Sequence, residues 1–418
     1  MSSSSESTPT PTPTVAPATA LARAVGDPGS VRRAVVGVLA AFALNGAYVG
    51  AYGASLPGLR ERFDTDARGL AILLVSAGLA AVTTMQLGGR WSDRVGARLP
   101  TVAGAPVMAA GLTVLAFAPS IPVAVMGAIV FGLGNGCMDV SMNTLAVHVE
   151  RRRGRPAMSR FHAFFSIGSA IGAGLSALVG RIPVDEDAHV QITLVTVAIL
   201  GLVLLVAMWP SVPQSEPEPR RTDGPRVPLP RATWLLGAMA ICFGLTEGTG
   251  FDWSSVHVTD VAEVSPATGA LGLVFVSVFM VAIRLVGDHA VERFGHKAVV
   301  SAGAATAVVG YVVTIVGTAL PVLLAGWALV GLGVGMIAPQ IYGTAGNLGG
   351  GRVMGVVVGF GYAAFLTGPA LIGAVADEVG IARAMFIPLA TGLGLVVMAR
   401  WMPRVHPRTP GVAPPPEG

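Results

Sequence analysis

The sequence predicts an all-α integral membrane protein, with twelve transmembrane helices in two six-helix bundles around a central cavity. Three observations carry this prediction: an apolar composition, twelve apolar runs and an internal repeat. Of the 418 residues, 53% are hydrophobic and only 12% are charged, whereas a soluble domain carries about a quarter charged residues. Glycine is abundant, at 55 residues, as it is where helices pack closely in lipid. The bilayer is therefore the expected solvent for most of the chain.

The apolar runs divide the chain into twelve candidate helices, each near the ~20 residues that a bilayer requires. Pro119-Ser120-Ile121-Pro122 separates the third run from the fourth, and Leu320-Pro321 separates the ninth from the tenth. We expect spans at 34–57, 68–88, 99–118, 121–147, 160–180, 189–209, 232–257, 266–286, 298–318, 320–346, 353–375 and 381–402.

Two unrelated segments repeat at one offset. The polar loop from Gly89 to Arg98 aligns with the loop from Asp288 to Lys297 at an offset of 199, and Gly132-Leu133-Gly134-Asn135-Gly136 aligns with Gly331-Leu332-Gly333-Val334-Gly335 at the same offset. A shared offset indicates a duplicated unit. In a membrane protein, duplicated halves are typical of secondary transporters with their site between the halves. Glycines spaced by four share one helix face, so Gly132 with Gly136 and Gly331 with Gly335 predict close helix contacts.

The distribution of basic residues predicts the topology. With the N-terminus inside, 22 Lys and Arg fall on the cytoplasmic side and five fall outside: Arg60, Arg62, Arg68, Arg181 and Arg383. The positive-inside rule then puts both termini of a multi-pass cell-membrane protein in the cytoplasm. We expect a disordered cytoplasmic tail at 1–31, an N-terminal bundle at 32–209, a cytoplasmic linker at 210–231, a C-terminal bundle at 232–402 and a cytoplasmic tail at 403–418.

The repeated loop, the twelve spans and the central linker together resemble the major facilitator superfamily. The resemblance covers nearly the whole chain apart from the tails. It implies that the loop latches the outward-facing state, with the two glycines allowing tight turns and the charges pairing with helix ends. The residues of this motif are Gly89, Asp93, Arg94, Gly96 and Arg98, and in the second copy Asp288, Arg293 and Gly295.

Two branches of that superfamily are more similar still. Asp139-Val140-Ser141-Met142-Asn143 resembles the acid-x-x-x-Asn signature of proton-coupled fucose permeases. The stretch from Arg155 to Ala163, and Glu247 with Asp252-Trp253-Ser254, resemble bacterial permeases grouped with a rhizopine-transport membrane protein. The fifth helix lacks the Gly-Pro signature of drug/proton antiporters, because Gly368-Pro369 falls in the eleventh helix instead.

The resemblance implies that the first, fourth, seventh and tenth helices line the cavity, and these helices carry most of the polar side chains inside the spans. Polar groups are costly in lipid and normally face a cavity or another helix. The substrate-binding candidates are Asn45, Tyr48, Asn143, Glu247, Asp252, Trp253, Gln340 and Tyr342.

Asp139 and Glu247 are the candidate proton-coupling residues. Asp139 is the one acid in the interior of the first six spans, and burial disfavours its charged form. The alternative is that Asp139 only bonds neighbouring helices, and that Glu247 only lines the pore. His162 could relay protons or be a structural histidine.

The spans have no basic residue at mid-membrane if Arg284 lies at a helix end, as we expect. Such a cavity suits a neutral sugar or polyol, or an amine, better than an anion. The sequence therefore predicts a secondary active transporter for a small polar solute, working by alternating access and coupled to protons. A drug or metabolite exporter is the alternative, and a sensor or scaffold is disfavoured because it needs no duplicated halves.

Other classes of protein and partner are not indicated. The sequence contains no Ser-His-Asp set, metal-ligand spacing or phosphate-binding Gly loop ending in Lys-Ser/Thr, so we expect no enzyme, cofactor or metal. Cys137 and Cys242 both fall in apolar spans and are expected to pack as small apolar residues. A net charge of +4 is no evidence for nucleic-acid binding. The expected partners are a small-molecule substrate, protons and the lipid bilayer, and the expected state is a monomer.

Overall fold

The computed structural model describes residues 28–154, 157–215 and 228–403, except for the side chains of residues 28, 288 and 349–351. The described part contains twelve helices that are long and apolar enough to cross a membrane. Each of the twelve predicted spans corresponds to one of them. The membrane-spanning fold is therefore confirmed.

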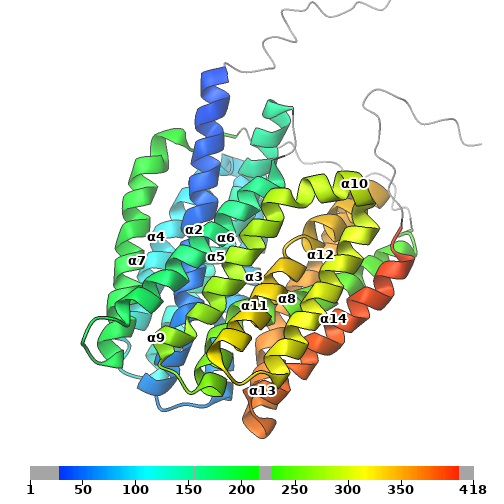
Figure 1. The fold of residues 1–418 in the computed structure, drawn as a ribbon. Helices are drawn as coiled ribbons and strands as arrows, with labels where there is room; N and C mark the ends of the chain where they lie inside the picture. The colour runs from blue at the N-terminus through cyan, green and yellow to red at the C-terminus, as the bar shows by residue number, and fades with distance from the viewer. Residues whose placement is uncertain (1–27, 155–156, 216–227, 404–418) are drawn as a thin grey trace, which may run out of the picture.

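The helices of the first half are α2 (Pro28–Arg62), α3 (Ala67–Val95), α4 (Arg98–Phe117), α5 (Ile121–Arg153), α6 (Met158–Val179), α7 (Glu186–Met208) and the short η1 (Trp209–Ser211). Those of the second half are α8 (Ala232–Ala262), α9 (Pro266–Gly269), α10 (Leu271–Val316), α11 (Leu320–Val334), α12 (Ile337–Val379), α13 (Ile381–Ala384), α14 (Phe386–Met398) and η2 (Ala399–Trp401). Figure 1 shows the first half, coloured blue to green, and the second half, coloured green to red.

Several helices extend beyond the predicted boundaries. The first begins at Pro28, within the segment expected to be a tail, and α5 continues to Arg153. Two long helices each contain parts of two spans: α10 passes through a kink at Gly295, and α12 joins the end of the tenth span to the eleventh. Most of the predicted linker, 216–227, and the residues 1–27 and 404–418 lie outside the described residues.

The two halves repeat the same close helix contacts. A Cβ atom added to Gly132 of α5 would lie 2.1 Å from the backbone oxygen of Ala77 in α3. At the same offset of 199, a Cβ added to Gly331 of α11 would lie 2.2 Å from the backbone oxygen of Val276 in α10. Glycine is required at these points because any side chain would separate the helices. The predicted close contacts of Gly132 and Gly331 are confirmed, and they occupy equivalent positions in the two halves.

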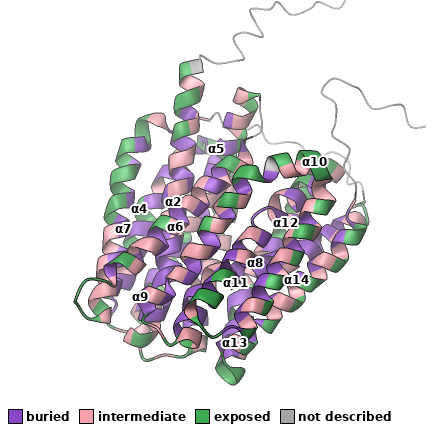
Figure 2. Ribbon diagram, in the orientation of Figure 1, coloured by how far each residue is buried: buried purple, intermediate pink, exposed green. Residues whose placement is uncertain are grey.

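The pattern of buried and exposed residues on the helices is that of a protein in a bilayer. Buried residues lie between the helices, and exposed residues cover the outward faces of peripheral helices such as α7 (Figure 2). Val206 of α7 is 75% exposed and Val203 is 60% exposed, which is normal for side chains that face lipid. We call the end of the bundle with the turns at Gly96 and Gly295 the basic face, and the other end the opposite face.

Candidate functional site

A cavity of about 340 Å³ lies between the two halves. Helices α2, α3, α5 and α6 of the first half line it, as do α8, α10 and α12 of the second. Its polar lining residues are Asn45, Tyr52, Asn135, Asp139, His162, Glu247, Asp252, Arg284 and Tyr362. Both predicted proton-coupling residues therefore reach the same cavity, which a site at the interface of duplicated halves requires.

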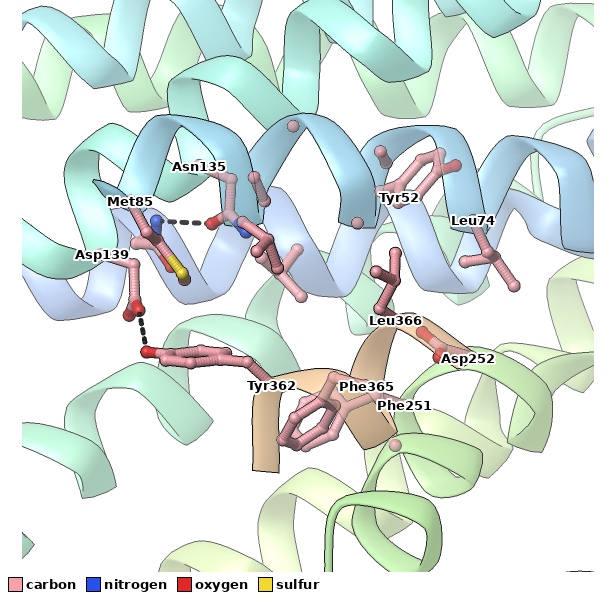
Figure 3. Close-up of a pocket in the computed structure, with 18 of the residues that line it drawn as sticks. Tyr52, Leu74, Met85, Asn135, Asp139, Phe251, Asp252, Tyr362, Phe365 and Leu366 are labelled. Atoms are coloured by element: carbon pink, nitrogen blue, oxygen red, sulfur yellow. Dashed lines mark hydrogen bonds between the residues drawn. The ribbon is translucent and has the colours of Figure 1, made fainter. Parts of the chain in front are cut away.

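Asp139 extends from α5 toward the second half (Figure 3). The hydroxyl of Tyr362, on α12, donates to Asp139 Oδ2 over 3.3 Å. From one turn further along α5, Asn143 Nδ2 donates to Asp139 Oδ1 over 3.2 Å and to the Asp139 backbone oxygen over 2.9 Å. No ion pair involves Asp139 within the described part of the chain. The carboxylate is thus held by neutral donors, one of them from the other half.

Glu247 has the basic partner that the sequence analysis did not expect. Arg284 is only 8% exposed, and its Nη2 lies 3.4 Å from Glu247 Oε1. Arg284 lies near the end of its span, Pro266–Gly287, as expected, but its side chain lines the cavity, so the expectation of a cavity without a base is wrong. The reason is that the long side chain of Arg284 reaches from this end of its span to Glu247 in α8. With Arg284 in its lining, the cavity no longer excludes anionic substrates by charge.

Arg284 also joins the two halves. Its Nη1 donates to the backbone oxygen of His162 over 3.0 Å and to Ser166 Oγ over 2.6 Å, both on α6. Its Nε donates to the backbone oxygen of Gly335 over 3.0 Å. Every nitrogen of this buried guanidinium is occupied, as a buried charge requires.

The end of the cavity nearer the opposite face contains Asp252, close to Leu74, Phe251 and Leu366 (Figure 3). No ion pair of Asp252 and no hydrogen bond of the Tyr52 hydroxyl is found among the described residues. These two polar groups are available to a bound solute, because nothing else in this part of the protein satisfies them.

The remaining walls combine amides with aromatic rings. Asn45 Nδ2 donates to Asn135 Oδ1 over 3.0 Å, which fixes two neighbouring amides at the cavity surface. Phe165 and Phe251 come from opposite halves, with ring centroids 6.0 Å apart. Phe131, 4.9 Å from the ring of Tyr52, also lines the cavity. Such a surface can accept hydroxyl or amine hydrogen bonds and pack against a ring.

Five predicted substrate-binding residues lie outside the cavity lining. Tyr48 is fully buried and donates to the backbone oxygen of Ala198 over 3.1 Å. Trp253 is fully buried in α8. Gln340 Oε1 hydrogen-bonds His296 Nδ1 over 2.6 Å, and the hydroxyl of Tyr342 lies beside Gly361, a later residue of the same helix, α12. Asn143 supports Asp139 rather than lining the cavity. In this conformation the tenth span therefore does not contribute to the cavity, and α3, α6, α10 and α12 contribute instead.

The loop motif forms turns as expected, because Gly96 has φ +84° and Gly295 has φ +80°. Arg98 Nη2 donates to the backbone oxygen of Trp209 over 2.9 Å, at the end of α7. Its counterpart Lys297 donates to the backbone oxygen of Arg400, at the end of the twelfth span. Gly89 lies near Val140, whereas Asp93, Arg94 and Arg293 are exposed, and the side chain of Asp288 lies outside the description.

Salt bridges between the halves are found at the opposite face. Arg60, at the end of α2, pairs with Asp260 of α8. Arg68, at the start of α3, pairs with Asp377 over 2.9 Å and with Glu378 over 2.5 Å, both in α12. These pairs connect the two halves at that end of the bundle.

Twelve spans in two duplicated halves around a buried polar cavity define a helical membrane transporter. The chain belongs to the Major Facilitator Superfamily, whose family model matches residues 38–346. It is 33% identical over 359 residues to an uncharacterized transporter, y4wD, of Sinorhizobium fredii, covering 84% of this chain and 93% of the relative. It is 27% identical over 362 residues to the membrane protein MosC of Rhizobium meliloti, covering 84% of this chain and 86% of MosC.

Among solved structures, the fold resembles the transporter FucP in the outward conformation. The TM-score is 0.63 at 15% identity, and the match covers 88% of this chain and 98% of FucP. At that identity the likeness shows the fold alone. Family and relatives together identify the chain as a secondary transporter, and the superfamily resemblance of the sequence is confirmed.

Proposed function

We propose that this transporter moves a small polar solute through the central cavity by alternating access, and that Asp139 couples this movement to protons. The observation that carries the proposal is the placement of Asp139. It is a carboxylate in the cavity, bonded across the interface by Tyr362, with no cation in an ion pair with it among the described residues. Such a group can gain and lose a proton more readily than a carboxylate fixed in a salt bridge.

The hydrogen bond from Tyr362 links the protonation state of Asp139 to the movement of the two halves. A hydrogen bond to a charged acceptor is stronger than one to a neutral acceptor. Protonation of Asp139 therefore weakens an attachment between α5 and α12, which belong to different halves. Loss of the proton strengthens it again, so the protonation state biases the equilibrium between the conformations.

The substrate that we propose is a sugar, a polyol or an amine-like solute. The cavity volume of about 340 Å³ lies at the small end of the range for ligand pockets. Three carboxylates, two amides and two tyrosines face it, against one guanidinium that is already occupied by Glu247 and by backbone oxygens. Hydroxyl and amine groups match these acceptors, and the phenylalanine rings match the flat face of a cyclic solute.

We place the basic face in the cytoplasm, which puts both ends of the chain there. The support is the 22-to-five distribution of Lys and Arg. With that orientation, the Arg60–Asp260 and Arg68–Asp377 pairs close the outer end, so the conformation is inward-facing. The exposure of Asp93 and Arg94 agrees with a loop latch that forms only in the outward-facing state.

An exporter of drugs or metabolites from the same superfamily is the second candidate. Its support is the large apolar share of the cavity wall, where Met85, Met142 and four phenylalanines line the space. Methionine and aromatic side chains adapt to varied apolar ligands. An exporter would be stabilised by apolar cations rather than by hexoses or polyols.

The test begins with the purified protein and a panel of hexoses, cyclic polyols, amines and apolar cations, scored by the increase in unfolding temperature. The stabilising compound is then supplied to proteoliposomes with an imposed pH gradient, and to proteoliposomes preloaded for exchange. Asp139→Asn is expected to retain exchange and lose pH-driven accumulation. Glu263→Gln, which alters an exposed carboxylate away from the cavity, is the control and should accumulate substrate normally. Accumulation by Asp139→Asn against the substrate gradient would place the proton site elsewhere.

A further inference from the structure

A second hollow of the molecule faces away from the central cavity. It is a groove of about 580 Å³ on the outer surface of the first half, between α4 and α7. Its walls are apolar: Leu99, Val102 and Pro106 come from α4, and Leu205, Val206 and Trp209 come from α7 and η1. From Leu99 to Pro106 the groove follows α4 for about 10 Å. It therefore runs from the basic face into the apolar part of the bundle.

A cation lies at the end of this groove. The guanidinium carbon of Arg98 is 5.2 Å from the ring centroid of Trp209, and Arg98 Nη2 donates to the Trp209 backbone oxygen. Arg98 Nε is buried and makes no hydrogen bond to any described residue. No carboxylate of the described chain forms an ion pair with Arg98. A positive charge with spare donors thus adjoins an apolar groove.

The backbone adds to this positive end. Helix α4 begins at Arg98. Ser215 Oγ accepts from the N–H of Ala97 over 2.7 Å. Pro100 has no N–H, so the amide groups of Arg98 and Leu99 remain at this end. The N-terminus of a helix carries a partial positive charge with amide groups that favour an anion. A long apolar groove with a cation at its interfacial end is complementary to a lipid with a negative headgroup, because basic pockets between transmembrane helices recognise such headgroups.

We infer that this groove binds an anionic phospholipid of the bilayer, with one acyl chain between α4 and α7 and the phosphate on Arg98. The site is separate from the transport cavity, so the inference does not depend on the substrate or on proton coupling. A zwitterionic lipid would supply the same chain but less net negative charge for Arg98. Selectivity between the two lipids is therefore the property to measure.

The experiment is native mass spectrometry of the full-length protein, exchanged into detergent with phosphatidylglycerol or phosphatidylcholine of identical chains. Wild type should retain phosphatidylglycerol in preference to phosphatidylcholine. Arg98→Gln should lower phosphatidylglycerol occupancy by about fivefold, the effect of one interfacial cation. Ala103→Phe, which fills the groove from α4, should lower retention of both lipids.

Two further variants separate the site from general effects. Arg98→Lys keeps the charge and should retain phosphatidylglycerol, which would show that loss in Arg98→Gln is not a folding defect. Lys297→Gln removes the repeat-equivalent cation of the other half and should retain phosphatidylglycerol like wild type. Equal retention of the two lipids by wild type, unchanged retention in Arg98→Gln or Ala103→Phe, or an equal loss in Lys297→Gln would overturn the inference.

Discussion

Arg284 and Glu247 show how one buried ion pair can organise both the site and the interface between the halves. The guanidinium contacts Glu247 in its own half and α6 in the other half. Breaking a buried pair costs more than the pair contributes, because the remaining charge has no partner. The pair therefore acts as a unit, and a change to one member leaves the other buried without a charge partner.

We expect Arg284→Gln to lower the unfolding temperature strongly, since an uncompensated buried charge costs roughly 3–5 kcal/mol. Arg284→Gln combined with Glu247→Gln should recover part of that loss, because no unpaired charge remains. Thermal unfolding of the purified variants measures both effects. A double variant no more stable than Arg284→Gln would show that the contacts to His162 and Ser166, rather than the ion pair, carry the stability.

Part of this site could be predicted at the level of single residues. Asp139 and Glu247 were identified because acids are rare inside apolar spans, and both line the cavity. Arg284 lies near the end of its span, as the sequence indicates, but its place in the cavity could not be predicted, because the contact with Glu247 depends on how α10 and α8 pack. Tyr362 was missed because a tyrosine in an apolar, glycine-rich span resembles a packing residue. Its distance to Asp139 is a property of the assembled halves.

At the scale of helices, glycine determines how closely the elements approach. The contacts of Gly132 with α3 and of Gly331 with α10 leave no room for a methyl group. Gly174 of α6 has the reverse environment, with nothing within 4 Å of an added Cβ. The chain thus contains helical glycines that are required by packing and others, such as Gly174, that are not.

We expect Gly132→Ala and Gly331→Ala each to destabilise the protein by about 1–3 kcal/mol, the usual cost of overpacking. Gly174→Ala should be neutral or stabilising, since alanine has the higher helix propensity and meets no neighbour. Unfolding temperatures of the three variants provide the comparison. Similar losses in all three would mean that helix packing does not distinguish these positions.

The helices themselves were predictable because the bilayer imposes length and hydropathy, and the turn glycines because the repeat aligned them. The boundaries were less predictable, since α5 and α12 extend past the apolar region into sequence that is polar or glycine-rich. Which helices line the cavity was expected from resemblance alone. The structure adds α3, α6, α10 and α12, because the halves meet along α3 with α12 and along α6 with α10.

At the scale of the whole molecule, the ion pairs of the opposite face hold one conformation. Arg60 and Asp260 are 21% and 28% exposed, so each pair alone contributes little in water. Two such connections between the same halves still bias the equilibrium between conformations in which the opposite face is closed or open. About 1.4 kcal/mol changes the ratio of two such states tenfold.

We expect Arg60→Asp to open the opposite face, because it replaces attraction to Asp260 with repulsion. In a background with Cys137 and Cys242 replaced, a single cysteine at Leu74 in the cavity should react faster with an impermeant maleimide added at that face. The exchange Arg60→Asp with Asp260→Arg should restore the slow reaction. Equal labelling of all three proteins would show that these charges do not control access to the cavity from the opposite face.

The central claim is that Asp139 carries a proton with each substrate molecule, and proton movement measures this most directly. Wild-type proteoliposomes with weak internal buffer and a pH-sensitive dye receive the panel compound that stabilises the protein, without an imposed gradient. Uptake should acidify the interior in wild type. Uptake by Asp139→Asn should proceed without any change of internal pH. No pH change in wild type, or the same acidification in Asp139→Asn, would contradict the account.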